Sequence, residues 1–196
     1  MSWPCFWVER TPEAEISLHR YCRQDKGCPL GRDYHNASVA IGRQLLMLSE
    51  RDTVAALHVE DYADRPEWPT ACGCGYEFTD DDERQVNQEP IYRADDGREW
   101  PHKSLPPGAM QDGAWLRPFG VGPDGIALVV VLPPAKSDSR GHWWHVDGPS
   151  RNNGVPGPGW TRTGDPHNPP SLSVTPSILT SDYHGFLTAG VLTDSL

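Results

Sequence analysis

The sequence has no apolar run that approaches the roughly 18 residues needed to cross a bilayer. Its first residues, Met1 to Cys5, lack the basic region followed by an apolar stretch that marks an export signal. Basic charge is also scarce, because 17 Lys and Arg stand against 27 Asp and Glu, for a formal net charge of −10. A field of this sign repels phosphate backbones. We therefore expect a protein made and kept in the cytoplasm, or packaged from it, with neither a membrane nor nucleic acid among its partners.

Several common catalytic motifs are missing as well. The sequence contains no Gly-x-Ser-x-Gly turn, no Cys-x-x-Cys pair and no glycine-rich phosphate loop with its lysine. Two groups of carboxylates, Asp80–Glu83 and Asp95-Asp96, stand where a solvated turn would place charge. The motif content therefore favours a role without enzymatic activity.

What the sequence does contain is aromatic residues and turn formers. Only 37% of the residues are apolar and the mean hydropathy is −0.59, while 20 Pro and 19 Gly predict many loops. Eight Trp, six Tyr and four Phe provide a small aromatic core. Short alternating or apolar segments, typical of strands, occur at Cys5–Val8, Ile16–Cys22, Ala37–Ile41, Ile91–Trp100, Ile126–Leu132, His142–Val146, Ser171–Ile178, Tyr183–Leu187 and Val191-Leu192. We predict a mainly β fold: one compact barrel- or sandwich-like domain over residues 1–196, with long Pro/Gly-rich loops and at most one or two short helices.

Some of these segments carry stronger signals than others. Ile126–Leu132 is a run of seven apolar residues, which predicts a central strand buried on both faces and paired with His142–Val146. Thr188-Ala189-Gly190 predicts the turn of a C-terminal hairpin. Thr11-Pro12-Glu13 also fits a helix N-terminus, an alternative to the favoured strand. Residues 101–125, rich in Pro and Gly, are predicted to form an ordered loop.

The five cysteines are Cys5, Cys22, Cys28, Cys72 and Cys74. An odd number without an export signal argues against a disulfide framework. Cys72-Gly73-Cys74-Gly75 is the most metal-like motif, because glycines let the backbone fold around an ion, although zinc knuckles usually space their cysteines by two to four residues. The other two ligands would be Cys28 and either Cys22 or His35, in or beside the turn-rich loop 23–34.

The predicted metal site thus consists of Cys28, His35, Cys72 and Cys74, with Cys22 as the alternative to His35, and would hold a structural zinc ion. The competing interpretation is that these are buried thiols beside a tight turn.

Two further groups of residues suggest binding. His145 and Asp147 share one face of a strand, so that with His184 and His167, which lie further along the chain, they could form a second, catalytic metal site. Packing of aromatic and imidazole rings across strands explains them more simply. The eight tryptophans exceed the evident needs of a small core, and some of them are candidates for a face that binds a sugar or a partner protein.

Several patches of the chain resemble small uncharacterised proteins encoded by tailed bacteriophages of actinobacteria. The C-terminal patches are Trp160, Gly164-Asp165-Pro166, Pro170-Ser171-Leu172, Pro176-Ser177-Ile178, Tyr183-His184-Gly185-Phe186 and Gly190-Val191-Leu192. The upstream patches are Cys5-Phe6-Trp7-Val8-Glu9, Tyr34-His35-Asn36-Ala37, Cys72 to Tyr76 and Pro107-Gly108-Ala109-Met110. The resemblance implies a phage origin and assigns no chemistry to any residue.

The expected function follows from this resemblance and from the missing catalytic motifs. We expect a structural or interaction protein of a tailed phage particle, either a capsid or a tail accessory protein, which contacts other phage structural proteins in the virion. Two alternatives stay open. One is a small metal-dependent hydrolase built on His145, Asp147 and His184, and the other is an intracellular phage module that binds a host factor.

Overall fold

Strands dominate the structure, as the alternating segments predict. The computed structural model describes residues 1–22, 35–49, 54–116, 120–134, 142–147, 151–152, 155–156, 159–180 and 183–195. Strands account for 52% of the described residues and helical turns for 8%, and no helix in these ranges reaches seven residues. The predicted mainly β fold is confirmed. The described sheets do not close into a barrel, which leaves the sandwich-like arrangement. Within the described ranges, no helix has both the length and the apolar character needed to cross a membrane.

The contacts between residues divide the chain into two compact units. The first unit comprises Met1–Arg10 with Tyr92–Leu196, and the second comprises Thr11–Ile91. Two long strands, β2 (Phe6–Cys22) and β4 (Arg84–Ala94), contribute residues to both units. The single domain predicted over residues 1–196 stays a prediction.

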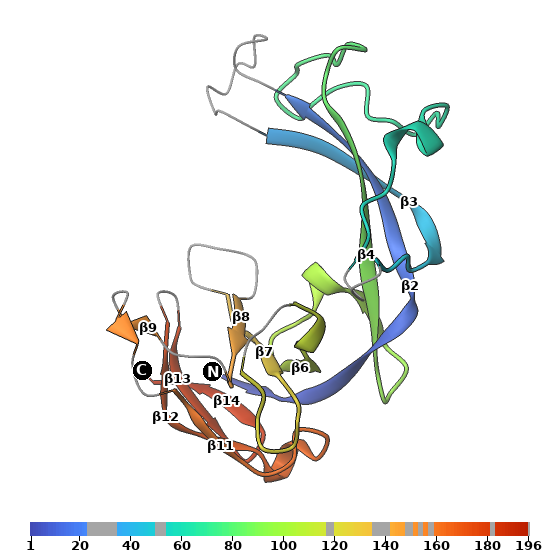
Figure 1. Ribbon diagram of the computed structural model, residues 1–196. Helices are drawn as coiled ribbons and strands as arrows, with labels where there is room; N and C mark the ends of the chain where they lie inside the picture. The colour runs from blue at the N-terminus through green and yellow to red at the C-terminus, as the bar shows by residue number, and fades with distance from the viewer. Residues whose placement is uncertain are drawn as a thin grey trace. The chain divides into compact units, whose positions relative to one another are not determined.

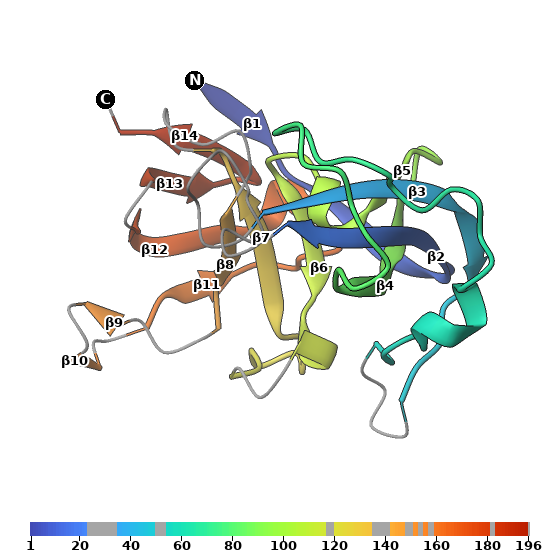
Figure 2. The same ribbon diagram turned by 90° about the horizontal axis from the view of Figure 1, so that it is seen from above.

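The first unit contains an antiparallel five-stranded sheet. Its strands follow the order β1 (Ser2–Pro4), β14 (Val191–Asp194), β13 (His184–Thr188), β12 (Ser173–Leu179) and β11 (Thr161–Thr163). Figures 1 and 2 show the orange and red strands side by side, and Figure 2 shows the blue β1 next to β14. Thr188 pairs with Val191 across the two-residue turn Ala189-Gly190, whose φ angles are 49° and 70°. Positive φ at both turn residues is the geometry that matches strand twist, and the predicted C-terminal hairpin is confirmed.

A second sheet has the order β5-β4-β2-β6-β7-β8, and β3 also pairs with β2. Its other strands are β3 (His35–Leu45), β5 (Glu99–Pro101), β6 (Ala109–Asp112), β7 (Leu128–Leu132) and β8 (His142–His145). Every residue of β7 is buried, and β8 pairs with it antiparallel, as the sequence predicts. The remaining short elements are β9 (Arg151–Asn152), β10 (Val155–Pro156), η2 (Val59–Tyr62), η3 (His102–Ser104), η4 (Ala114–Leu116) and η5 (Pro169–Ser171).

Strand β6 corrects the prediction of a loop over residues 101–125. Only four residues long, it pairs antiparallel with β7, where Met110 faces Val130. It also pairs parallel with β2, where Met110 faces Trp7. Both partners are distant in sequence, so the short strand is defined by tertiary pairing and not by local propensity.

The alternation of side chains along β7 creates two cores in the first unit. Leu128, Val130 and Leu132 pack with residues of the five-stranded sheet, including Leu187 and Leu192. Val131 packs on the other side with Tyr92 and Val8. Side chains that alternate between two apolar environments explain why this strand is apolar throughout.

In the second unit, β2 and β3 form a long antiparallel pair, from Glu13 opposite Leu45 to Cys22 opposite His35 (Figure 1). β2 runs unbroken through Thr11-Pro12, so the alternative of a helix beginning there is wrong. Pro12 lacks an N–H, but its carbonyl accepts a hydrogen bond from Leu46 N (2.8 Å), and the Thr11 hydroxyl accepts one from Glu13 N (3.2 Å). These bonds satisfy the backbone around the proline within an extended strand.

His102 of η3 is an ionisable group within the aromatic packing of the first unit. Its ring centroid lies 3.7 Å from that of Trp143, 5.2 Å from Trp115 and 5.4 Å from Tyr92. Burial, with a smaller contribution from the Lys103 charge, lowers the pKa of His102 to about 3. The imidazole is therefore neutral in the folded protein at neutral pH.

We expect this histidine to make the fold sensitive to acid. Its pKa is near 6.5 in an unfolded chain, so the unfolded state binds the extra proton between about pH 6.5 and about pH 3. Stability is therefore lost as the pH falls through this window, by at most about 1.4 kcal/mol per pH unit from this group. Urea unfolding of the wild type and of His102→Phe, which keeps an aromatic ring, measures the effect. The variant should lose less stability between pH 6.5 and 4, and an equal loss in both proteins would contradict the assignment.

Candidate functional site

The candidate site of the second unit starts from the buried face of β2. Along this part of the strand, buried and partly exposed residues alternate, and Leu18, Arg20 and Cys22 fall on the buried face. Cys22 is fully buried, with 0% of its surface exposed. The period-2 pattern of the sequence thus directs this thiol inward at the last residue of the strand.

Cys72 and Cys74 come from a tight hairpin further along the chain. Ala71 and Glu77 form an antiparallel bridge, and Cys72 N donates to Tyr76 O (2.8 Å). Gly75 N donates to Cys72 O (2.9 Å), which closes a four-residue turn. Gly75 has a φ of +88°, a conformation that glycine adopts without strain. The glycines of the Cys-Gly-Cys-Gly motif therefore make the turn that carries both thiols.

The three thiols converge. The Sγ atoms of Cys22, Cys72 and Cys74 all lie within 4.8 Å of one another, and those of Cys22 and Cys74 are 3.8 Å apart. Cys22 and Cys72 are buried, and Cys74 is partly exposed. The group packs against the rings of Tyr76 and Phe78. Three thiols at this spacing could hold a metal ion.

Arg20 attaches the cysteine hairpin to β2. Its guanidinium donates hydrogen bonds to the carbonyl oxygens of Pro69 (3.3 Å) and Thr79, one on each side of the hairpin. The same group lies 5.0 Å above the ring of Phe78. Burial lowers the pKa of Arg20, and so does the nearby Arg84 charge, while Asp82 and Asp80 oppose the shift.

Asp82 holds the far end of the hairpin. Its carboxylate accepts hydrogen bonds from Thr79 N (2.7 Å), from the Thr79 hydroxyl (3.1 Å) and from the Tyr76 hydroxyl (3.2 Å). Only 4% of Asp82 is exposed, which corrects the expectation that Asp80–Glu83 is a solvated patch. Asp80 and Asp81 are exposed as expected. Asp82 is therefore a structural anchor for the segment that carries the thiols.

The predicted metal ligands have different outcomes. Cys72 and Cys74 lie together in the thiol group, and Cys22, considered as an alternative ligand, is its third member. Cys28 lies outside the described residues. The backbone of His35 pairs opposite Cys22 in β3, and its side chain is not among those described. A fourth ligand from either residue stays a prediction.

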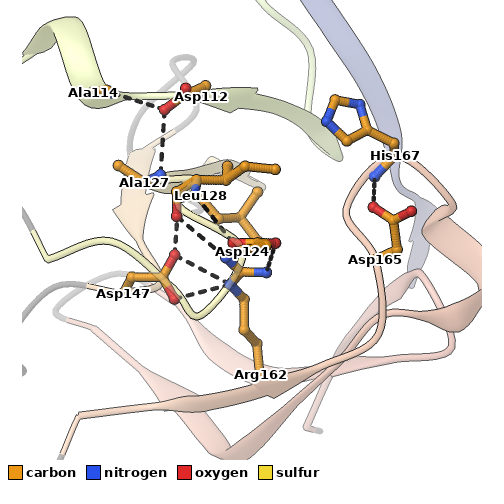
Figure 3. Close-up of polar contacts among 10 residues, drawn as sticks. Asp112, Ala114, Asp124, Ala127, Leu128, Asp147, Arg162, Asp165 and His167 are labelled. Carbon is orange, nitrogen blue, oxygen red and sulfur yellow. Dashed lines mark hydrogen bonds and ion pairs between the residues drawn. The ribbon is translucent and has the colours of Figure 1, made fainter.

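Asp147, one of the residues of the alternative hydrolase site, has other partners. Asp147 accepts hydrogen bonds from Arg162 Nε at 2.9 and 3.1 Å and from Leu128 N at 3.0 Å (Figure 3). Arg162 also donates to Asp124 and to the carbonyl of Ile126. The Arg162 side chain is 3% exposed and that of Asp147 is 8% exposed. Asp147 is therefore the anion of a buried ion pair in the first unit.

The hydrogen bonds and charges of this ion-pair network shift the pKa values of Asp124 and Arg162. Hydrogen bonds from Arg162 lower the pKa of Asp124 to about 2, and the two carboxylates in turn raise the pKa of Arg162. Asp124 and Arg162 therefore stay charged at neutral pH. The sequence gives no local signal for this network, because its members lie in separate segments of the chain.

The thiol group is the one group of three or more metal-ligating side chains with suitable spacing among the described residues, which include His145, Asp147 and His184. No family model matches the chain, and no curated protein or solved structure matches it. The chemistry of the thiol group therefore has to be argued from its own residues.

Proposed function

We propose that this chain is a structural or interaction protein in which a zinc ion cross-links the second unit through Cys22, Cys72 and Cys74. The observation that carries the proposal is the convergence of three thiols from two segments far apart in sequence. A zinc site with four protein side chains as ligands has no open position for a substrate, so with a fourth ligand from Cys28 or His35 the role of this site is structural.

The spacing of the thiols supports zinc in particular. Thiolates bound to tetrahedral zinc at about 2.3 Å from the metal lie about 3.8 Å from one another. The Cys22 and Cys74 sulfurs are already 3.8 Å apart, so these two need no rearrangement. Soft thiolate ligands also select zinc over the hard cations Mg²⁺ and Ca²⁺. Cys28 and His35, which both follow Cys22 along the chain, remain the proposed sources of a further ligand.

The need for such a cross-link supports the proposal as well. The apolar cluster around the thiols contains Cys22, Cys72 and the partly buried Cys74, Tyr76 and Phe78, and no large aliphatic side chain among the described residues. A metal contributes folding energy where a small apolar core supplies little. Its ligands would join the end of β2 to the hairpin at residues 71–77.

We propose that this protein acts within the particle of a tailed bacteriophage, in contact with other phage structural proteins. The support is the resemblance of the sequence patches to proteins of phages that infect actinobacteria. The test is mass spectrometry of particles of the encoding phage, purified by density and washed at high salt. Peptides of this chain should be enriched with those of the capsid and tail, relative to soluble host proteins in the same lysate. Recovery in the soluble fraction alone would rule out a virion component.

A further inference from the structure

The first unit contains a hollow that the zinc proposal does not use. Its volume is about 350 Å³, within the range of about 300–1,000 Å³ typical of small-molecule sites. The walls come from the first half of β2, the ends of β4 and β6, the helical turn η4, and the residues Ile126 and His167. None of the residues that line it belongs to the second unit, so the hollow does not depend on the thiol group.

Aromatic rings form much of its wall. Trp7, Tyr92 and Trp115 all line it. The His167 ring lies against Trp7, with 4.2 Å between ring centroids, and the Arg10 guanidinium lies 5.6 Å from the centre of the Trp115 ring. These contacts hold the two indoles in place, and a site held in advance loses less conformational entropy when a ligand binds.

The hollow also contains hydrogen-bond donors without acceptors, beside carboxylates that can accept further hydrogen bonds. Trp7 Nε1 and Arg10 Nη1 are buried and make no hydrogen bond to any described residue. The carboxylates of Glu9 and Asp112 line the same hollow. Asp112 Oδ1 accepts from Ala114 N (2.9 Å) and Ala127 N (3.3 Å), and no described group donates to Oδ2. Buried donors without partners are rare in folded proteins, so this cluster calls for a source of oxygen atoms.

Charge and shape together restrict the ligand. Glu9 and Asp112, together with the overall charge of −10, disfavour an anion, and Arg10 disfavours a cation. The three charged side chains disfavour a purely apolar molecule, because they would lose their hydration without compensation. The hollow therefore favours a neutral ligand. Its hydroxyl groups would both donate and accept hydrogen bonds, and an apolar C–H face would pack against the aromatic rings.

We propose that this hollow binds a neutral saccharide. Sugar hydroxyls would accept hydrogen bonds from Arg10, directly or through water held in the wall, and would donate hydrogen bonds to the carboxylates of Glu9 and Asp112. The C–H face of a sugar ring would pack on the wall formed by Trp115 and Trp7.

A second, smaller hollow makes an oligosaccharide the better ligand. It measures about 180 Å³ and shares Trp7 and His167 with the first hollow. It repeats the same chemistry, because Phe6 supplies an aromatic ring, and Asp95, Asp96 and Arg98 supply charges of both signs. Trp7 and His167 thus stand between two adjoining subsites, an arrangement that fits successive units of a sugar chain.

The polar network of Figure 3 holds the rim of the first hollow. Asp165 accepts a hydrogen bond from His167 N (2.9 Å), which fixes the turn that carries this ring. Arg162 donates to the carbonyl of Ile126, and Asp124 accepts from Ile126 N (3.0 Å). The position of Ile126 in the rim is therefore fixed by the Arg162 network, whose Arg162–Asp147 pair is buried.

The test is titration of the purified protein with cellotriose, maltotriose and the trimer of N-acetylglucosamine, followed by tryptophan fluorescence and two-dimensional NMR. Galacturonic acid trimer serves as the anionic control. At least one neutral trimer should bind with a Kd below about 1 mM, a threshold that excludes the weakest nonspecific contacts. The trisaccharide should bind more tightly than its monosaccharide.

Two variants locate the binding. Trp115→Ala removes the aromatic wall, and Glu9→Gln, at an exposed position, removes a charge without disturbing the core. Each should weaken binding by about tenfold or more. Phe186→Ala, which removes an exposed aromatic side chain on β13, is the matched control and should bind as the wild type does. The proposal is overturned if no neutral trimer binds, if the anionic trimer binds best, or if Glu9→Gln and Trp115→Ala both bind unchanged.

Discussion

Replacing Arg162 by methionine should lower the free energy of unfolding by about 3–5 kcal/mol, the usual cost of removing one partner from a buried ion pair. Methionine fills a similar volume but leaves the Asp147 carboxylate, 8% exposed, without its cation. The Ile126 carbonyl and Asp124 lose the hydrogen bonds that Arg162 donates to them in the same step. The cost comes mainly from the anion left buried, and less from the attraction that is lost.

An exposed ion pair supplies the control for this prediction. Arg98 contacts Asp96 with side chains that are 63% and 50% exposed, and solvent screens such pairs strongly. Arg98→Met should therefore change stability by less than about 1 kcal/mol. Urea unfolding of both variants at pH 7, followed by tryptophan fluorescence, makes the comparison. Equal stability losses in Arg162→Met and Arg98→Met would contradict a structural role for the buried network.

The double variant Arg162→Met with Asp147→Leu separates the two sources of the cost. If the unpaired anion dominates, the double variant should recover much of the stability lost by Arg162→Met alone, because no buried charge is left without a partner. If the lost attraction dominates, the double variant should be no more stable than the single one.

The sequence predicted the strands whose signals are local. The apolar run that contains Leu128–Leu132 needs no partner to be recognised as a buried strand, and Ala189-Gly190 identifies a tight hairpin by its residue types. Strand β6 was missed because Ala109–Asp112 follows Pro106, Pro107 and Gly108, and its pairing with β2 and β7 depends on distant residues. The helix alternative at Thr11-Pro12 failed for the same reason, since β3 and Leu46 supply the partners that keep this segment extended.

In the candidate sites, too, only the features with local sequence signals could be predicted. Cys72 and Cys74 were identified from a glycine-flanked motif, because the local backbone alone brings two thiols close together. The choice of Cys22 as their neighbour required the inward direction of β2 at its last residue and the position of the hairpin upon it. No local pattern connects Arg162 with Asp124 and Asp147, nor Trp7 with His167. Such contacts exist only once the separate segments are folded against one another.

Removal of zinc should destabilise the second unit more than it destabilises the first. Structural zinc in small domains contributes apparent binding energies of about 10–16 kcal/mol at neutral pH, as large as the whole stability of a typical domain. We expect the purified protein to contain about one zinc ion per chain. Cys22→Ser, Cys72→Ser and Cys74→Ser should each lower the zinc content, whereas Cys5→Ser should not, because Cys5 packs in the core of the first unit.

Hydrogen exchange, measured before and after a chelator removes the zinc, shows which segments zinc binding stabilises. Without the metal, amide protection should fall in Thr11–Cys22, in β3 and in the segment from Pro69 to Ile91, which the thiols and Arg20 join together. Protection in β7 and in β12–β14 should persist, because their core contains none of the three clustered cysteines. Acid should release the metal as well, since only deprotonated thiols bind it. A chelated protein that has lost its metal but keeps full protection in the second unit would show that the three thiols are packed side chains and not a cross-link.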